Sequence, residues 1–184
     1  MVKVGVLVGS LRKDAVSKKI AQAFIKLFPK GYDLKVIEIG DLPLFSEDYD
    51  NGNLTLPASY QRFRDEARAM DAYMFVTPEY NRSTSAALKN ALDVGSRPYG
   101  SSVWGGKPAL IVSQSPSNLS GFGANHHLRQ VLSFLDVYPM QQPEVYLAHS
   151  FELLDENNNF KNADTKKFVE GVIASFTEHI KRFK

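Results

Sequence analysis

The sequence contains no cysteine among its 184 residues. Disulfide bonds, thiolate nucleophiles, iron–sulfur clusters and zinc sites with thiolate ligands are therefore excluded together. The sequence also lacks any apolar run approaching the roughly 20 residues of a membrane-spanning helix. Residues 1–13 show no long apolar stretch followed by a small-residue cleavage site. We therefore expect a cytoplasmic protein that does not bind a membrane.

The chain has little excess of either charge, since its formal net charge at pH 7 is +2. It has no concentrated basic face, so nucleic acid is not an expected partner. The adjacent residues His126 and His127 would point about 100° apart on a helix, so they cannot chelate a metal as an i, i+4 pair does. A hydrophobic content of 43% provides an ample core, and no break in composition marks a linker. We expect one domain over residues 1–184, without a metal site.

Three motifs of common active sites are absent as well. The triphosphate loop, Gly-x-x-x-x-Gly-Lys followed by Ser or Thr, does not occur. The dinucleotide motif Gly-x-Gly-x-x-Gly is also missing, because only Gly5 and Gly9 are present in this region. An anion bound after the first apolar segment would therefore be a single terminal phosphate. A Ser-His-Asp hydrolase is not expected, because the sequence has no Gly-x-Ser-x-Gly elbow.

The sequence does contain a regular alternation of strand-like and helix-like segments. Short apolar runs predict strands at residues 3–9, 32–39, 72–77, 108–113 and 143–148. Apolar residues at helical spacing predict helices at residues 20–28, 60–70, 87–92, 128–135 and 169–183. This alternation is typical of α/β proteins, in which helices cover both faces of a parallel sheet. Such sheets bind ligands beyond the carboxyl ends of their strands, so the candidate site comprises the loops at residues 9–18, 77–86 and 113–123.

The loop at residues 9–18 combines hydroxyl groups with positive charge. Ser10 and Ser17 supply hydroxyl donors, and Arg12 supplies a planar guanidinium that matches two phosphate oxygens. Ser17 lies where the next helix should begin, so unpaired backbone amides should face the same place. The pattern is typical of a phosphate site, and a solvated basic turn is an equally weighted alternative.

The loop at residues 77–86 offers groups suited to a flat heterocycle. Pro78 should turn the chain off the strand. The residues after it carry a carboxylate, an aromatic ring and an amide, and they are Glu79, Tyr80 and Asn81. Ser83 or Ser85 should cap the following helix. The alternative is a plain turn before a capped helix, with Glu79 accepting hydrogen bonds from loop amides and Arg82 facing solvent.

Three motifs together carry a resemblance to a known family, and they are GSLRK at residues 9–13, PEYN at 78–81 and SAALKNALD at 85–93. The sequence resembles the NADPH-dependent FMN reductases of flavodoxin-like fold, which include bacterial quinone, azo-dye and chromate reductases. The resemblance continues through residues 106–113 and 127–136. It implies an α/β three-layer sandwich, with a five-stranded parallel sheet in the order 2-1-3-4-5 and helices on both faces.

The same resemblance implies noncovalent FMN as the cofactor and NADPH or NADH as the reductant. A small-molecule acceptor, such as a quinone, an azo dye, chromate or free flavin, would then take the electrons in a ping-pong cycle. A homodimer or homotetramer is also implied. For its contacts, the loop carrying Tyr99 and Trp104 and the helix at residues 125–136 are candidates, although both would serve equally well within the monomer.

The resemblance also assigns roles to single residues, and we expect no side chain to act as an essential acid or base. The phosphate would be bound by Ser10, Arg12 and Ser17, the flavin ring lined by Pro78, Glu79, Tyr80 and Asn81, and its other edge flanked by Ser113 and Ser115. Asp14 departs from the family pattern, because a carboxylate repels a phosphate unless it points away or pairs with a lysine. A flavodoxin-like electron carrier and a flavin-free regulatory domain are the alternative functions.

Overall fold

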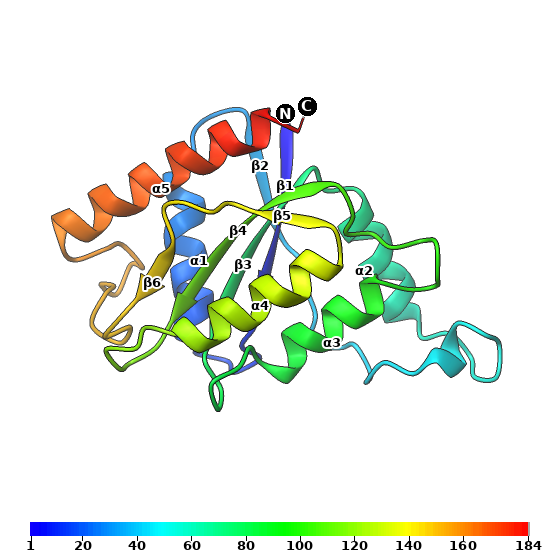
Figure 1. Ribbon diagram of the computed structural model, residues 1–184. Coiled ribbons are helices and arrows are strands. Elements are labelled where there is room, and N and C mark those ends of the chain that lie inside the picture. The colour runs from blue at the N-terminus through cyan, green and yellow to red at the C-terminus, as the bar shows by residue number, and fades with distance from the viewer. Residues whose placement is uncertain (184) are drawn as a thin grey trace.

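The computed structural model of the chain describes residues 1–183 and shows a sheet between two layers of helices (Figure 1). The strands are β1 Val2–Val8, β2 Tyr32–Val36, β3 Ala72–Pro78, β4 Lys107–Gln114, β5 Val137–Pro139 and β6 Val145–Leu147. The helices are α1 Val16–Leu27, α2 Ala58–Arg68, α3 Ala86–Gly95, α4 Phe122–Phe134 and α5 Ala163–Lys181. All strand pairs are parallel, in the order β2-β1-β3-β4-β5, which confirms the predicted flavodoxin-like sheet.

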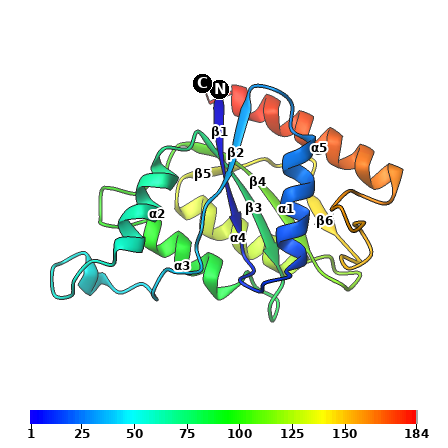
Figure 2. The same ribbon diagram turned by 180° about the vertical axis from the view of Figure 1, so that it is seen from behind.

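The sheet is buried on both faces, which explains the nearly continuous apolar runs of its central strands. Alternate residues of a strand point to opposite faces. Val4 and Val6 therefore pack with α1 and α5, while Leu7 packs with α2, α3 and α4. Figure 2 shows the layer of α1 and α5 from the side opposite to Figure 1. Within residues 1–183, no helix combines the length and the apolar character that crossing a membrane requires.

The edge beyond β4 is formed by two short strands instead of one. β5 pairs with the start of β4, where Val137 lies opposite Lys107, and β6 pairs with its end, where Val145 lies opposite Val112. The strand predicted at residues 143–148 corresponds to β6, whereas β5 was not predicted. Three residues are too few to show an alternating pattern, and Pro139 at the end of β5 has no N–H group for the ladder.

Trp104 lies in the core, so of the two roles considered for it, a dimer contact or packing within the monomer, the structure shows the second. Its ring centroid is 4.9 Å from that of Tyr73 and 6.0 Å from that of Phe63, and its Nε1 donates a hydrogen bond to the carbonyl oxygen of Leu92 at 2.9 Å. The ring fits against α3 only because position 95 is glycine, since a Cβ there would lie 2.6 Å from the indole. Tyr99, in the same loop, is 93% exposed.

Lys107 is expected to make the stability of the fold depend on pH. Its Nζ donates hydrogen bonds to the carbonyl oxygens of Ala67 (3.3 Å) and Arg68 (3.0 Å) at the end of α2, and burial lowers its pKa from 10.5 to about 8. Between pH 8 and 10 the unfolded chain therefore binds more protons, so the free energy of unfolding should rise with pH, by about 1 kcal/mol after allowance for solvent screening. Burial also raises the pKa of Tyr73. Above pH 10 the folded chain therefore keeps a proton that the unfolded chain loses, and the free energy of unfolding should fall again.

Urea denaturation at pH 8 and pH 10 measures this effect, with the Lys107→Met variant as the control. The variant should lose the rise between the two pH values even if its stability at pH 8 differs from that of the wild type. An equal rise in both proteins would assign the pH dependence to other groups.

Candidate functional site

Loops from four strands meet at the carboxyl edge of the sheet, toward the bottom of Figure 1. Between them lies a hollow of about 140 Å³, called the site hollow below. Most of the predicted site residues line it, and these are Ser10, Arg12, Ser17, Pro78, Glu79, Tyr80 and Ser115. Gln114, Ser150 and Phe151 line it too and were not predicted. The structure thus brings together four loops that are far apart in the sequence.

The β1–α1 loop places an uncapped helix end at the site hollow. No side chain within residues 1–183 caps α1, whose N-cap position is Ala15. The backbone N–H groups of Val16 and Ser17 have no acceptor within the helix, and both residues line the hollow. The positive end of the helix dipole therefore favours an anion here. Arg12 is exposed beside it and donates a hydrogen bond to the backbone oxygen of Asp14 at 3.1 Å.

Ser17 and Ser10 are held by hydrogen bonds to the end of β4 and to the loop after β3. The buried Ser17 Oγ accepts a hydrogen bond from Gln114 Nε2 at 2.9 Å. Because this bond occupies a lone pair of the oxygen, the hydroxyl hydrogen of Ser17 is free to donate to a ligand. Ser10 Oγ lies 3.3 Å from the Tyr80 hydroxyl, which joins the β1–α1 loop to the loop after β3. Both predicted serines are therefore positioned by residues at the ends of other strands or just after them.

The loop after β3 forms a tight two-residue hairpin that was not predicted. Tyr80 and Ser83 exchange two backbone hydrogen bonds of 2.9 and 3.0 Å. Asn81 and Arg82 between them have φ angles of 51° and 68°, the left-handed pair of a type I′ turn. Arginine rarely takes this conformation, and each such residue costs about 1–3 kcal/mol. Strain of this kind gathers at functional sites, and this hairpin borders the site hollow.

Glu79 binds the start of α4. Its Oε2 accepts a hydrogen bond from the N–H of Ala124 at 3.2 Å, and its Oε1 pairs with Arg82 at 3.1 Å. Gly123 allows this approach, since a Cβ there would lie 2.7 Å from the carbonyl oxygen of Arg82. The carboxylate of Glu79 thus accepts a hydrogen bond from a backbone amide, as the alternative reading of the sequence proposed. The amide belongs to α4 instead of its own loop.

The two serines considered as caps of α3 have different roles. Ser85 accepts a hydrogen bond from the N–H of Leu88 at 3.2 Å, so the cap predicted at Ser83 or Ser85 belongs to Ser85. Ser83 instead lies with its Oγ 2.8 Å from His127 Nδ1. His126 meets the Tyr146 hydroxyl at 3.1 Å, so the two histidines have separate partners. In the part of the chain that the structure describes, no group of three or more His, Asp or Glu side chains is placed to bind a metal ion.

Ser113 and Asn81 do not line the site hollow. The Ser113 Oγ is buried 3.2 Å from the carbonyl oxygens of Ser120 and Val145, and it accepts a hydrogen bond from Asn125 Nδ2 at 3.3 Å. It therefore connects β4 with β6 and α4. Asn81 lies at the tip of the hairpin, on the side of a second hollow of about 540 Å³ between α3 and α4.

Ser150, in the loop after β6, is the unpredicted residue with the clearest chemical signal. It is 2% exposed and lines the site hollow, and its Oγ has no hydrogen-bond partner within residues 1–183. Buried polar groups are nearly always hydrogen-bonded, so this hydroxyl indicates a missing acceptor. The phosphate of FMN is such an acceptor, and the uncapped start of α1 and the Ser17 hydroxyl supply further donors. The residues present therefore fit the phosphate end of FMN.

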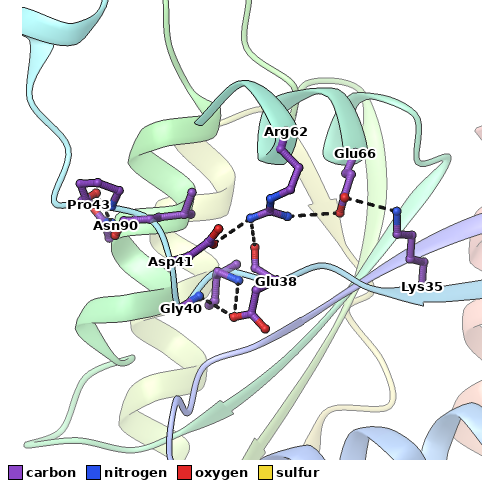
Figure 3. A network of polar contacts seen from close by, with 10 residues as sticks. Lys35, Glu38, Gly40, Asp41, Pro43, Arg62, Glu66 and Asn90 are labelled. Atoms are coloured by element: carbon purple, nitrogen blue, oxygen red, sulfur yellow. Dashed lines mark hydrogen bonds and ion pairs between the residues drawn. The ribbon is translucent and has the colours of Figure 1, made fainter. Parts of the chain in front are cut away.

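A polar network, shown in Figure 3, holds residues 38–45 against α2 and α3. Arg62 of α2 donates hydrogen bonds to the carbonyl oxygen of Glu38 at 2.9 Å and to the carboxylate of Asp41 at 2.8 Å. The side chain of Asn90 in α3 donates to a backbone oxygen of this segment at 2.9 Å and accepts from one of its N–H groups at 2.8 Å. The segment forms one wall of a hollow of about 610 Å³ that adjoins the site hollow beside α1.

Comparisons with known proteins agree with this architecture. Residues 2–152 match the family described as NADPH-dependent FMN reductase. A quinone reductase of Pseudomonas putida is 49% identical over 178 residues, which are 97% of this chain and 94% of that protein. A 2-hydroxy-1,4-benzoquinone reductase of a Burkholderia species is 42% identical over 91% of this chain and 90% of its own length. The structure of FerB, a flavoenzyme NAD(P)H:acceptor oxidoreductase from Paracoccus denitrificans, superposes with a TM-score of 0.93 at 33% identity, and the match covers 100% of this chain and 99% of FerB.

Proposed function

The chain belongs to the family of NADPH-dependent FMN reductases, and we propose that it reduces quinones with electrons from NAD(P)H in a ping-pong cycle. The observation that carries the proposal is the set of donors around the site hollow. These donors are the N–H groups at the uncapped start of α1, the Ser17 hydroxyl and the unpaired Ser150 hydroxyl. A single anion with several acceptor oxygens would satisfy all of them. Relatives that are 49% and 42% identical are described as quinone reductases, which supports the choice of acceptor.

The residues of the chain would bind and orient the cofactor. Ser10, Arg12 and Ser17, with the first amides of α1, would hold the phosphate. Pro78 and the Tyr80–Ser83 hairpin would lie beside the ring. When bound, FMN would supply the hydride-transfer chemistry between NAD(P)H and the second substrate. We assign no side chain an essential acid–base role.

Further acceptors and the assembly are also part of this proposal. Azo dyes, chromate and free flavin would be reduced by the same bound cofactor, and we place the protein in the cytoplasm. We propose a homodimer or homotetramer, supported by apolar side chains that lie exposed in the loop after β2 and on α4. Leu44 in that loop is 79% exposed and Phe134 at the end of α4 is 88% exposed.

Steady-state kinetics of the purified protein with FMN, NADPH and benzoquinone test the proposed function. We expect flavin absorption that stays with the protein on gel filtration, and NADPH oxidation that depends on the quinone. Double-reciprocal plots at several quinone concentrations should give parallel lines, and NADH should be compared with NADPH. A protein that binds no FMN would refute the proposal. A protein that binds FMN without oxidising NAD(P)H would be a flavodoxin-like carrier.

A further inference from the structure

Ser150 places an unsatisfied hydroxyl at the edge of the site hollow. Its backbone N–H donates a hydrogen bond to the carbonyl oxygen of Ser115 at 3.2 Å, which fixes the residue beside the loop after β4. Its Oγ, by contrast, is buried with no partner among the described residues. Burying a hydroxyl without a hydrogen bond destabilises a protein. The unpaired hydroxyl therefore destabilises the folded protein, and no hydrogen bond among residues 1–183 offsets this effect.

The segment that begins at Ser150 docks on α1. Asn158 Nδ2 donates a hydrogen bond to Gln22 Oε1 at 2.7 Å, and the ring of Phe160 packs edge-on against Phe24 with the centroids 6.1 Å apart. Ser150 thus lies on the α1 side of the sheet edge. The Tyr80–Ser83 hairpin lies on the other side, where Glu79 and Gly123 join it to α4. Ser150 is therefore at the end of the site hollow where α1 begins.

The groups at this end of the site hollow are mainly donors. The first N–H groups of α1 and the hydroxyl hydrogen of Ser17 are available, and Arg12 adds a positive charge. The carboxylate of Glu79 also lines the hollow, but it is bound to Ala124 and Arg82 on the hairpin side. A phosphate monoester has three oxygens that accept hydrogen bonds and carries about −1.5 to −2 charges near pH 7. It supplies the acceptor that the Ser150 hydroxyl lacks.

We propose that the Ser150 hydroxyl donates a hydrogen bond to the phosphate of bound FMN. The inference rests on the proposed FMN site and adds a phosphate ligand from the loop after β6. It explains why the hydroxyl is buried but unpaired in the protein alone. It also assigns Ser150 a role in cofactor binding and none in the hydride transfer.

The Ser150→Ala variant tests the inference through affinity and stability. In isothermal titration calorimetry of the flavin-free protein, the Kd for FMN should rise roughly 10-fold or more, as expected for a lost hydrogen bond to a charged group. The Kd for riboflavin, which has no phosphate, should stay the same. Without flavin, the thermal midpoint of the variant should equal or exceed that of the wild type, because an unpaired polar group has been removed.

Two further variants keep the test decisive. Ser150→Cys has nearly the same shape but a weak donor, so it should lose FMN affinity as the alanine variant does. Ser113→Ala removes a buried hydroxyl that has partners, so it should lower the thermal midpoint without flavin.

The possible outcomes separate this inference from the proposed function. Unchanged FMN affinity in both Ser150 variants, or an equal loss for FMN and riboflavin, would overturn the phosphate contact while leaving the FMN site in place. A wild-type protein that does not bind FMN would overturn both.

Discussion

The substitution Asp50→Ala is expected to lower the free energy of unfolding by about 3–5 kcal/mol, because it leaves the buried guanidinium of Arg64 without its counter-charge. The carboxylate of Asp50 accepts hydrogen bonds of 2.7 and 2.9 Å from the two terminal nitrogens of Arg64. The side chains of Arg64 and Asp50 are only 4% and 8% exposed. Arg64 Nε donates in addition to the carbonyl oxygen of Val94 at 2.9 Å, so the arginine cannot turn to solvent without losing a second contact.

Chemical denaturation of Asp50→Ala measures this loss, and Asp65→Ala is its matched control. Asp65 also lies beside an arginine of α2, Arg68, but this pair is 57% and 51% exposed. Exposed pairs contribute about 0–1 kcal/mol, so the control should unfold almost as the wild type does. If both variants lost the same small amount, the Asp50–Arg64 pair would not stabilise the buried arginine as its geometry indicates.

The substitution Arg12→Ala is expected to weaken FMN binding by about 1–3 kcal/mol, which raises the Kd roughly 5- to 150-fold. The Arg12 guanidinium is exposed at the mouth of the site hollow, beside the uncapped start of α1. Its one hydrogen bond among the described residues is to the backbone oxygen of Asp14, so most of its donors remain for a phosphate. Arg12→Lys keeps the charge but loses the fork that binds two oxygens, and an intermediate Kd is expected.

Calorimetric titration of flavin-free Arg12→Ala with FMN measures the change, and Lys30→Ala controls for net charge. Lys30 is an exposed cation beyond the other end of α1, so its removal should leave the Kd unchanged. The loss in Arg12→Ala should also shrink as salt is added, because salt screens exposed charges. An unchanged Kd in Arg12→Ala would make the residue a solvated part of a basic turn, which was the alternative drawn from the sequence.

The features predicted from the sequence are those set by local pattern. The central strands could be predicted from the sequence because burial on both faces requires continuous apolar runs. The loop at residues 9–18 could be selected as a candidate phosphate site because it places hydroxyl groups and an arginine close together in sequence, and several of its residues line the site hollow. Ser85 was one of two candidate caps, since serine before an apolar helical stripe is a local signal.

The features that escaped prediction depend on contacts between distant segments. Ser150 stands in no recognisable motif. It was missed because its proposed role depends on lining the same hollow as the first residues of α1, which lie more than a hundred positions earlier in the chain. The I′ turn at Asn81 and Arg82 lacks the glycine that normally reveals such a turn. Ser113 follows the family resemblance in sequence, but its hydroxyl is hydrogen-bonded to backbone oxygens and does not line the site hollow.

Gly95 and Trp104 restrict which substitutions the chain can accept. Any side chain at position 95 would meet the indole within 2.6 Å, so a change there is tolerated only alongside a smaller residue at 104. A smaller residue at 104 alone leaves a void among Phe63, Tyr73 and Phe75. The effects of the two substitutions are therefore strongly non-additive. We therefore expect these two positions to change together in related sequences.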